Sequence, residues 1–109
     1  MSFEVKSIPI FDKQVKRLSK KYSSLKLDLK YFANSLEVNP KQGTPLGFGC
    51  YKVRLSIASK GKGKSGGARV ITHIVISEGV VYLLSIYDKS ERSSVSNLEI
   101  RELVKSIPR

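Results

Sequence analysis

The sequence predicts one small α+β domain, in the order β-α-α-β-β-β with a short C-terminal helix, whose helices pack on one face of a mainly antiparallel sheet. Two helical patterns of apolar residues lie in the first part of the chain, and three strand-like runs follow them. The 109 residues are enough to bury one hydrophobic core without disulfides or structural metal. We therefore expect residues 1–109 to form a single domain.

The N-terminal part of the chain is predicted to form a strand and two helices. Apolar and polar residues alternate over residues 3–8, which suits a strand with one buried face. Apolar residues then recur at helical spacing over residues 11–22, and Asp12 is expected to cap this helix. A second helical stripe covers residues 25–36 and ends before Pro40, because proline cannot continue a helix.

The rest of the chain is predicted to form a three-stranded meander and a last helix. Strands are expected over residues 50–58, 68–77 and 80–87. Residues 43–47 are expected to form a loop, and Gly79 a tight hairpin turn, whereas a long Gly-rich loop joins the first two strands. Ser96 and Glu99 stand at capping-box spacing, which predicts a short terminal helix.

The charge distribution points to a polyanionic partner. The chain carries a formal net charge of +11 and has no acidic residue between Glu37 and Glu78. The cations in that interval are Lys41, Lys52, Arg54, Lys60, Lys62, Lys64 and Arg69. A surface of this kind attracts nucleic acid or an acidic protein and repels other copies of the chain.

Composition argues against several kinds of protein. Cys50 is the only cysteine and His73 the only histidine, so we expect no disulfide, no zinc site and no small-molecule cofactor. The sequence shows neither the apolar stretch of a signal peptide nor a run that could span a bilayer, which favours a cytoplasmic protein without a membrane partner. The Gly-rich run fits a relaxed P-loop pattern, but it leads into a strand instead of a helix, and we reject that reading.

Cations are predicted to gather on the outer face of the sheet. Side chains alternate along a strand, so Lys52 and Arg54 share a face, opposite the apolar one. If the next strand pairs antiparallel, Arg69 lies near them, on the same face as His73. Like charges on neighbouring strands destabilise a sheet, so this cluster either has a function or splays into solvent.

Such a cluster offers the groups that metal-free RNA cleavage requires. Attack of a 2′-hydroxyl on the adjacent phosphate needs a base, donors for the phosphoryl oxygens, and an acid for the leaving 5′-oxygen. Lys52 is the candidate base, because neighbouring cations favour its neutral amine, and Arg69 is the candidate phosphate clamp. Residue types alone do not separate this site from one that only binds RNA.

Three segments resemble toxins of the RelE/ParE superfamily, specifically the RelE and HigB branch of type II toxin–antitoxin modules. These are residues 50–55, residues 67–71 beyond the Gly-rich loop, and residues 84–92. The resemblance implies a single RelE/HigB-like toxin domain: a ribosome-dependent endoribonuclease, or mRNA interferase, that cuts mRNA in the decoding site. It also implies a cognate antitoxin as partner, beside the ribosome and its mRNA.

The resemblance also assigns roles to individual residues. The active-site positions of RelE-type toxins map onto Lys52, Arg54 and Arg69. Contacts with RNA are expected from Lys60, Lys62, Lys64 and Arg92. The chain departs from the family pattern at Ser90 and Ser96, where an arginine and a tyrosine are usual. The proton donor therefore stays open.

Nearby residues can replace the missing proton donor. Tyr87, Lys89 and Arg92 are close enough in sequence, and we favour Lys89 because a charged donor also stabilises the transition state. His73 is a further candidate, although a lone strand histidine is more often structural. Two other functions stay open at this point: a ParE-like inhibitor of DNA gyrase, and an RNA-binding module without catalysis.

Overall fold

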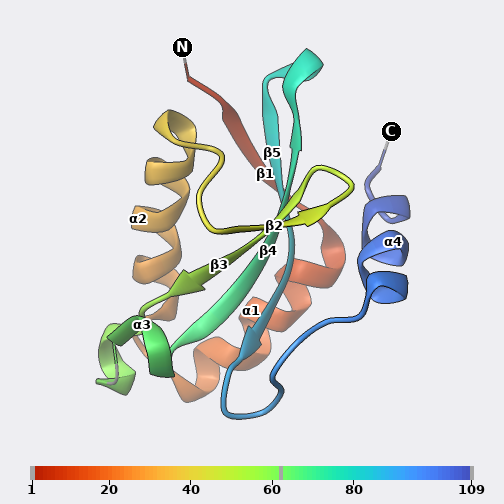
Figure 1. Cartoon of the computed structure of the whole chain (residues 1–109). Helices are drawn as coiled ribbons and strands as arrows, with labels where there is room; N and C mark the ends of the chain where they lie inside the picture. Colours follow the sequence, from red (N-terminus) through yellow and green to blue (C-terminus); the bar gives the residue numbers. More distant parts are fainter. Residues whose placement is uncertain (1, 62, 109) are drawn as a thin grey trace.

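The computed structural model describes residues 2–61 and 63–108. It contains a five-stranded sheet in the order β1-β5-β4-β3-β2, in which β1 runs parallel to β5 and the other neighbours are antiparallel (Figure 1). The strands are β1 (Glu4–Ser7), β2 (Thr44–Gly47), β3 (Cys50–Leu55), β4 (Ala68–Val75) and β5 (Val80–Asp88). The helices are α1 (Pro9–Lys21), α2 (Leu25–Val38), α3 (Gly63–Gly66) and α4 (Asn97–Lys105). This architecture confirms the predicted α+β class.

The two N-terminal helices form where the apolar pattern predicts them, but α1 begins earlier. Pro9 occupies its first turn, where the missing N–H group leaves no helical bond unmade. The expected cap at Asp12 is wrong, because Ile8 is the N-cap and Asp12 lies inside the first turn. The Asp12 carboxylate instead accepts a hydrogen bond of 2.6 Å from the Ser7 hydroxyl.

Thr44–Gly47 forms the edge strand β2 where the sequence predicts a loop over residues 43–47. Thr44 pairs with Lys52, and Pro45 pairs with Tyr51 before a register shift interrupts the ladder. Proline and glycine normally indicate a break, but an edge strand needs hydrogen bonds on one side only and tolerates both. The added strand β2 covers the edge of β3 and so flanks Lys52.

The hydrophobic core lies between the sheet and the helices α1 and α2. Leu18, Leu25 and Leu36 from these helices are completely buried, as is Val70 of β4. In Figure 1, α1 runs behind the central strands, whereas α4 stands apart from α2 on the other side of β5. The predicted N-cap of α4 is confirmed, since the Ser96 hydroxyl accepts a hydrogen bond of 3.1 Å from the backbone of Glu99.

The described part of the Gly-rich segment between β3 and β4 contains two short helical elements. It holds a 3₁₀ turn at Ala58–Lys60 and the single helical turn α3 before it re-enters the sheet. Ser24 and Ser59 tie the segment to the start of α2 through hydrogen bonds of 2.8 and 2.9 Å. At Gly67 a Cβ atom would stand 2.1 Å from the Leu55 carbonyl oxygen, so the return of the chain requires glycine.

Within residues 2–61 and 63–108, no helix has the length and apolar character needed to cross a membrane. The same part of the chain contains no group of three or more His, Cys, Asp or Glu side chains that could hold a metal ion.

Candidate functional site

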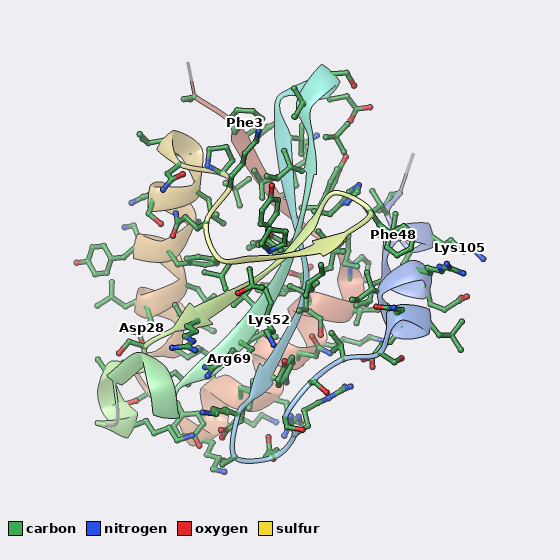
Figure 2. All side chains as sticks on the ribbon, in the orientation of Figure 1. Phe3, Asp28, Phe48, Lys52, Arg69 and Lys105 are labelled. Carbon is green, nitrogen blue, oxygen red and sulfur yellow. The ribbon has the colours of Figure 1, made fainter. Side chains whose placement is uncertain are left out.

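Two basic residues of the meander, Arg54 and Arg69, lie in one row with Tyr87 across three strands. Arg54 of β3 lies opposite Arg69 of β4, and Arg69 lies opposite Tyr87 of β5. Lys52 precedes Arg54 by two positions, so strand alternation places it on the same face. Figure 2 shows Lys52 and Arg69 on the side of the sheet away from α1. The predicted cluster is therefore assembled by strand register.

The cations of this row differ in exposure. Arg54 is exposed and Lys52 is half-buried, whereas Arg69 is only 5% exposed. One Arg69 nitrogen donates a hydrogen bond of 3.1 Å to the carbonyl of Ala68, which fixes part of the guanidinium. This pair suits the binding of a phosphate. Arg69 provides a guanidinium of fixed position, and the exposed Arg54 can move to contact the ligand.

Tyr87 completes the row but keeps its hydroxyl covered. The residue is 4% exposed, and its hydroxyl makes no hydrogen bond within the described part of the chain. Burial raises the pKa of the phenol, and the positive charges of Arg69 and Arg92 partly oppose this. The Arg92 guanidinium lies 5.3 Å from the ring centroid and is held by Glu99 at 2.6 Å. Tyr87 is therefore protonated at neutral pH and lies beneath Arg92.

Lys89 lies next to the row at the end of β5. Its backbone N–H donates to the Gly67 carbonyl at 3.2 Å, which continues the pairing of β5 with β4 by one residue. Alternation along the strand then puts Lys89 on the same side as Tyr87. The side chain is exposed, so it is accessible to a bound ligand.

Asp88 follows Tyr87 in β5, so its side chain points to the opposite face of the sheet, where it binds residues of three other segments. Its completely buried carboxylate accepts hydrogen bonds from Lys60 at 2.6 Å, from the Tyr22 hydroxyl at 2.5 Å, and from the backbone and hydroxyl of Ser90. Burial alone would raise the pKa of Asp88, but the hydrogen bonds from Lys60, Tyr22 and Ser90 outweigh it and hold the pKa far below its usual range. Ser90 therefore has a structural role here.

The cations expected to contact RNA have different environments in the structure. The Lys60 side chain is 10% exposed and paired with Asp88, so it anchors the Gly-rich segment instead of reaching outward. Lys62 lies outside the described residues, and so does the side chain of Lys64. Arg92 is exposed but bound to Glu99 by two hydrogen bonds.

His73 lies outside the basic row. It shares a face of β4 with Arg69 but is four residues away, about 13 Å along the strand. Its Nδ1 is 3.5 Å from the Sγ of Cys50, and both residues are buried. Burial raises the pKa of the Cys50 thiol to about 11, so the thiol stays protonated at neutral pH.

Two hollows meet at the exposed end of the row. One, of about 270 Å³, is lined by Lys52, Arg54, Thr44 and Gln42 among others. The second, of about 380 Å³, lies toward α2 and also includes Arg54 and Gln42, with the exposed Tyr31. The sequence reasoning missed Tyr31 and Gln42. The available signal was an aromatic residue on the polar side of a predicted helix.

No protein-family model matches the chain. Its fold is nevertheless that of the RelE toxins. The isolated Escherichia coli RelE toxin is 19% identical, with a TM-score of 0.61 over 95% of this chain and 97% of that one. A double arginine-to-alanine variant of E. coli RelE in the free state is 18% identical, with a TM-score of 0.62 over 99% of this chain and 100% of that one. A chain of the Mycobacterium tuberculosis toxin–antitoxin complex RelBE2 is 15% identical, with a TM-score of 0.60 over 86% of this chain and 95% of that one.

Proposed function

We propose that this chain is the toxin of a type II toxin–antitoxin module and acts as a ribosome-dependent mRNA endoribonuclease. The observation that carries the proposal is the row Arg54–Arg69–Tyr87, with Lys52 on the same face of a RelE-type fold. Directly opposed arginines destabilise a sheet, and a phosphate bound between them would relieve their repulsion. The cytoplasm, where mRNA is translated, would be its place of action.

The roles follow from exposure and position. Lys52 is the base that takes the proton of the attacking 2′-hydroxyl, and Arg69 holds the phosphoryl oxygens with Arg54. The bond from the 2′-oxygen to phosphorus forms as the bond to the 5′-oxygen breaks. Lys89 gives its proton to that 5′-oxygen. No metal ion takes part in this scheme.

Tyr87 has a different role in this scheme. Its hydroxyl is buried beneath Arg92, whereas Lys89 is exposed on the same side of the strand end. We therefore assign proton donation to Lys89. Tyr87 supports Arg69 from the neighbouring strand.

We propose a cognate antitoxin as the protein partner. One structure of similar fold was solved as a toxin–antitoxin complex. Neutralisation of this chain would require acidic side chains over Lys52, Arg54 and Arg69, since masking the cations removes the phosphate site.

The test is primer extension on mRNA in a cell-free translation reaction, with translating ribosomes compared to naked mRNA. Arg54→Ala is the main variant because Arg54 is exposed, and Arg69→Ala is run in parallel with a circular dichroism spectrum to check folding. Lys13→Ala removes an exposed charge on α1 and serves as control. Cuts that need ribosomes and Arg54 support the proposal, whereas undisturbed mRNA and translation contradict it.

A ParE-like gyrase inhibitor is the rival on the same fold superfamily. DNA damage in expressing cells with intact translation would favour it. A non-catalytic RNA-binding module would instead bind RNA with a steep dependence on salt and cut nothing.

A further inference from the structure

The hollow between α2 and β3 has the features of a nucleotide-binding subsite. It has a volume of about 380 Å³, and its lining includes Asp28, Tyr31, Phe32, Ser35, Gln42 and Arg54. Arg54 and Gln42 also line the smaller hollow beside Lys52. Arg54 therefore connects the proposed cleavage face with a second cavity at the edge of the sheet.

Tyr31 gives this hollow an accessible aromatic ring. The residue is 65% exposed, although large aromatic side chains are mostly buried in folded domains. Phe32, beside it in the lining, is 7% exposed and belongs to the core. An exposed aromatic ring near an arginine is the combination with which proteins hold single-stranded RNA, the ring stacking on a base and the arginine meeting a phosphate.

The polar groups of the hollow are oriented by their own contacts. The side-chain nitrogen of Gln42 donates hydrogen bonds of 3.0 Å to the Ser35 hydroxyl and to the Asn39 carbonyl. These bonds orient the carboxamide, whose oxygen accepts no hydrogen bond from the described residues and can accept one from a base edge. Asp28 is the one acidic residue in the described lining, and its carboxylate accepts bonds from Ser24 at 2.7 Å and from the Ala58 backbone at 3.1 Å.

We propose that this hollow binds one nucleotide of the RNA, next to the scissile phosphate held by Arg54 and Arg69. The base stacks on Tyr31, Gln42 accepts from its edge, and Arg54 connects this subsite with the scissile phosphate. This inference rests on the proposed function for the identity of the ligand. RNA is favoured over an acidic peptide because the hollow pairs a flat aromatic face with a cation shared with the phosphate site.

The chain contains no tryptophan, so Tyr31→Trp places a single indole in the hollow. The probe is a short 2′-O-methyl oligouridylate, which binds without a 2′-hydroxyl to cleave. We expect saturable quenching of the indole emission as the base stacks, weakened by added salt. Leu27→Trp is the matched control, since Leu27 is 53% exposed one turn earlier on α2 but does not line the hollow.

Affinity variants test the same subsite without an introduced fluorophore. With end-labelled oligouridylate and fluorescence anisotropy, Tyr31→Ala should weaken binding roughly 5- to 100-fold, whereas Tyr31→Phe should bind nearly as the natural chain does. Arg54→Gln in the Tyr31→Trp background should abolish most of the quenching. These measurements need neither ribosomes nor cleavage.

The outcomes separate the subsite from the proposed function. Quenching specific to Tyr31→Trp supports the subsite even if no mRNA is cut in translation reactions. Absence of saturable quenching, or unchanged RNA affinity in Tyr31→Ala, overturns it even if the chain cleaves mRNA. Unchanged RNA affinity with weakened binding of an antitoxin would assign the hollow to the protein partner instead and would likewise overturn the proposal.

Discussion

Arg54 and Arg69 occupy directly opposed positions on the antiparallel strands β3 and β4. Their side chains share the face of the sheet away from α1, and Lys52 lies on it as well. Like charges at opposed positions lower the stability of a sheet by a few tenths to about 1 kcal/mol. Two opposed arginines also suit the binding of a phosphate.

Arg54→Gln should therefore increase stability while it lowers activity. We expect the free energy of unfolding to rise by about 0.2–1 kcal/mol, because the repulsion from Arg69 is removed. Urea denaturation followed by circular dichroism measures this, and added salt should stabilise the natural chain more than the variant. Lys30→Gln, which removes an exposed cation of α2 with no such neighbour on an adjacent strand, is the control. A less stable Arg54→Gln protein would contradict the expectation.

Asp88 should control the acid stability of the fold. Its pKa is held below the ordinary value of about 3.9, so its contribution is fully present above about pH 5 and is lost as the pH falls further. Asp88→Asn should lack this part of the acid limb and be less stable at pH 7 by roughly 3–5 kcal/mol, because Lys60 loses its buried partner.

Urea titrations between pH 3 and pH 7, a range that brackets the ordinary carboxyl pKa of about 3.9, check the role of Asp88. Lys60→Met removes a hydrogen bond that lowers the pKa of Asp88, so less stability should be lost as the pH falls from 7 to 3. Asp12→Asn changes an exposed carboxylate bonded to Ser7 and should leave the profile nearly unchanged. If Asp88→Asn and the natural chain lose the same free energy of unfolding between pH 7 and pH 3, Asp88 does not have this role.

Lys89→Ala should reduce the rate of mRNA cleavage by about 10²- to 10⁴-fold, the usual contribution of a general acid. Tyr87→Phe removes only the buried hydroxyl and should retain most of the activity. Cleavage rates on translating ribosomes at saturating toxin measure both variants. The reverse order of effects would transfer proton donation to Tyr87 and would require Arg92 to move away from its ring.

Cys50 should be nearly inert to alkylation in the folded chain. Its thiol is 1% exposed with a pKa raised to about 11, so at pH 8 only about 0.1% is thiolate. Iodoacetamide labelling followed by mass spectrometry should be slow in buffer and fast in denaturant. Rapid labelling of the folded protein would show that the Cys50–His73 contact opens readily.

Much of the fold follows from local sequence patterns. Helical periodicity predicts α1 and α2, Pro40 marks the end of the second, and the Ser96–Glu99 pair predicts the cap of α4. These features depend on hydrogen bonds and contacts between residues close in sequence, which a pattern can report. The edge strand β2 was missed because Pro45 and its flanking glycines indicate a loop wherever the sheet partner is unknown.

The candidate site also combines features that the sequence predicts with features that it does not. The sequence by itself determined that Lys52 and Arg54 share a strand face, that the chain is strongly basic, and that no disulfide can form within these 109 residues. Only the tertiary structure decided that Arg54 opposes Arg69, that Lys60 forms an ion pair with Asp88, and that Tyr31 and Arg54 line the same hollow. Strand register and burial are set by contacts between residues distant in the chain, and these contacts exist only once the core has formed.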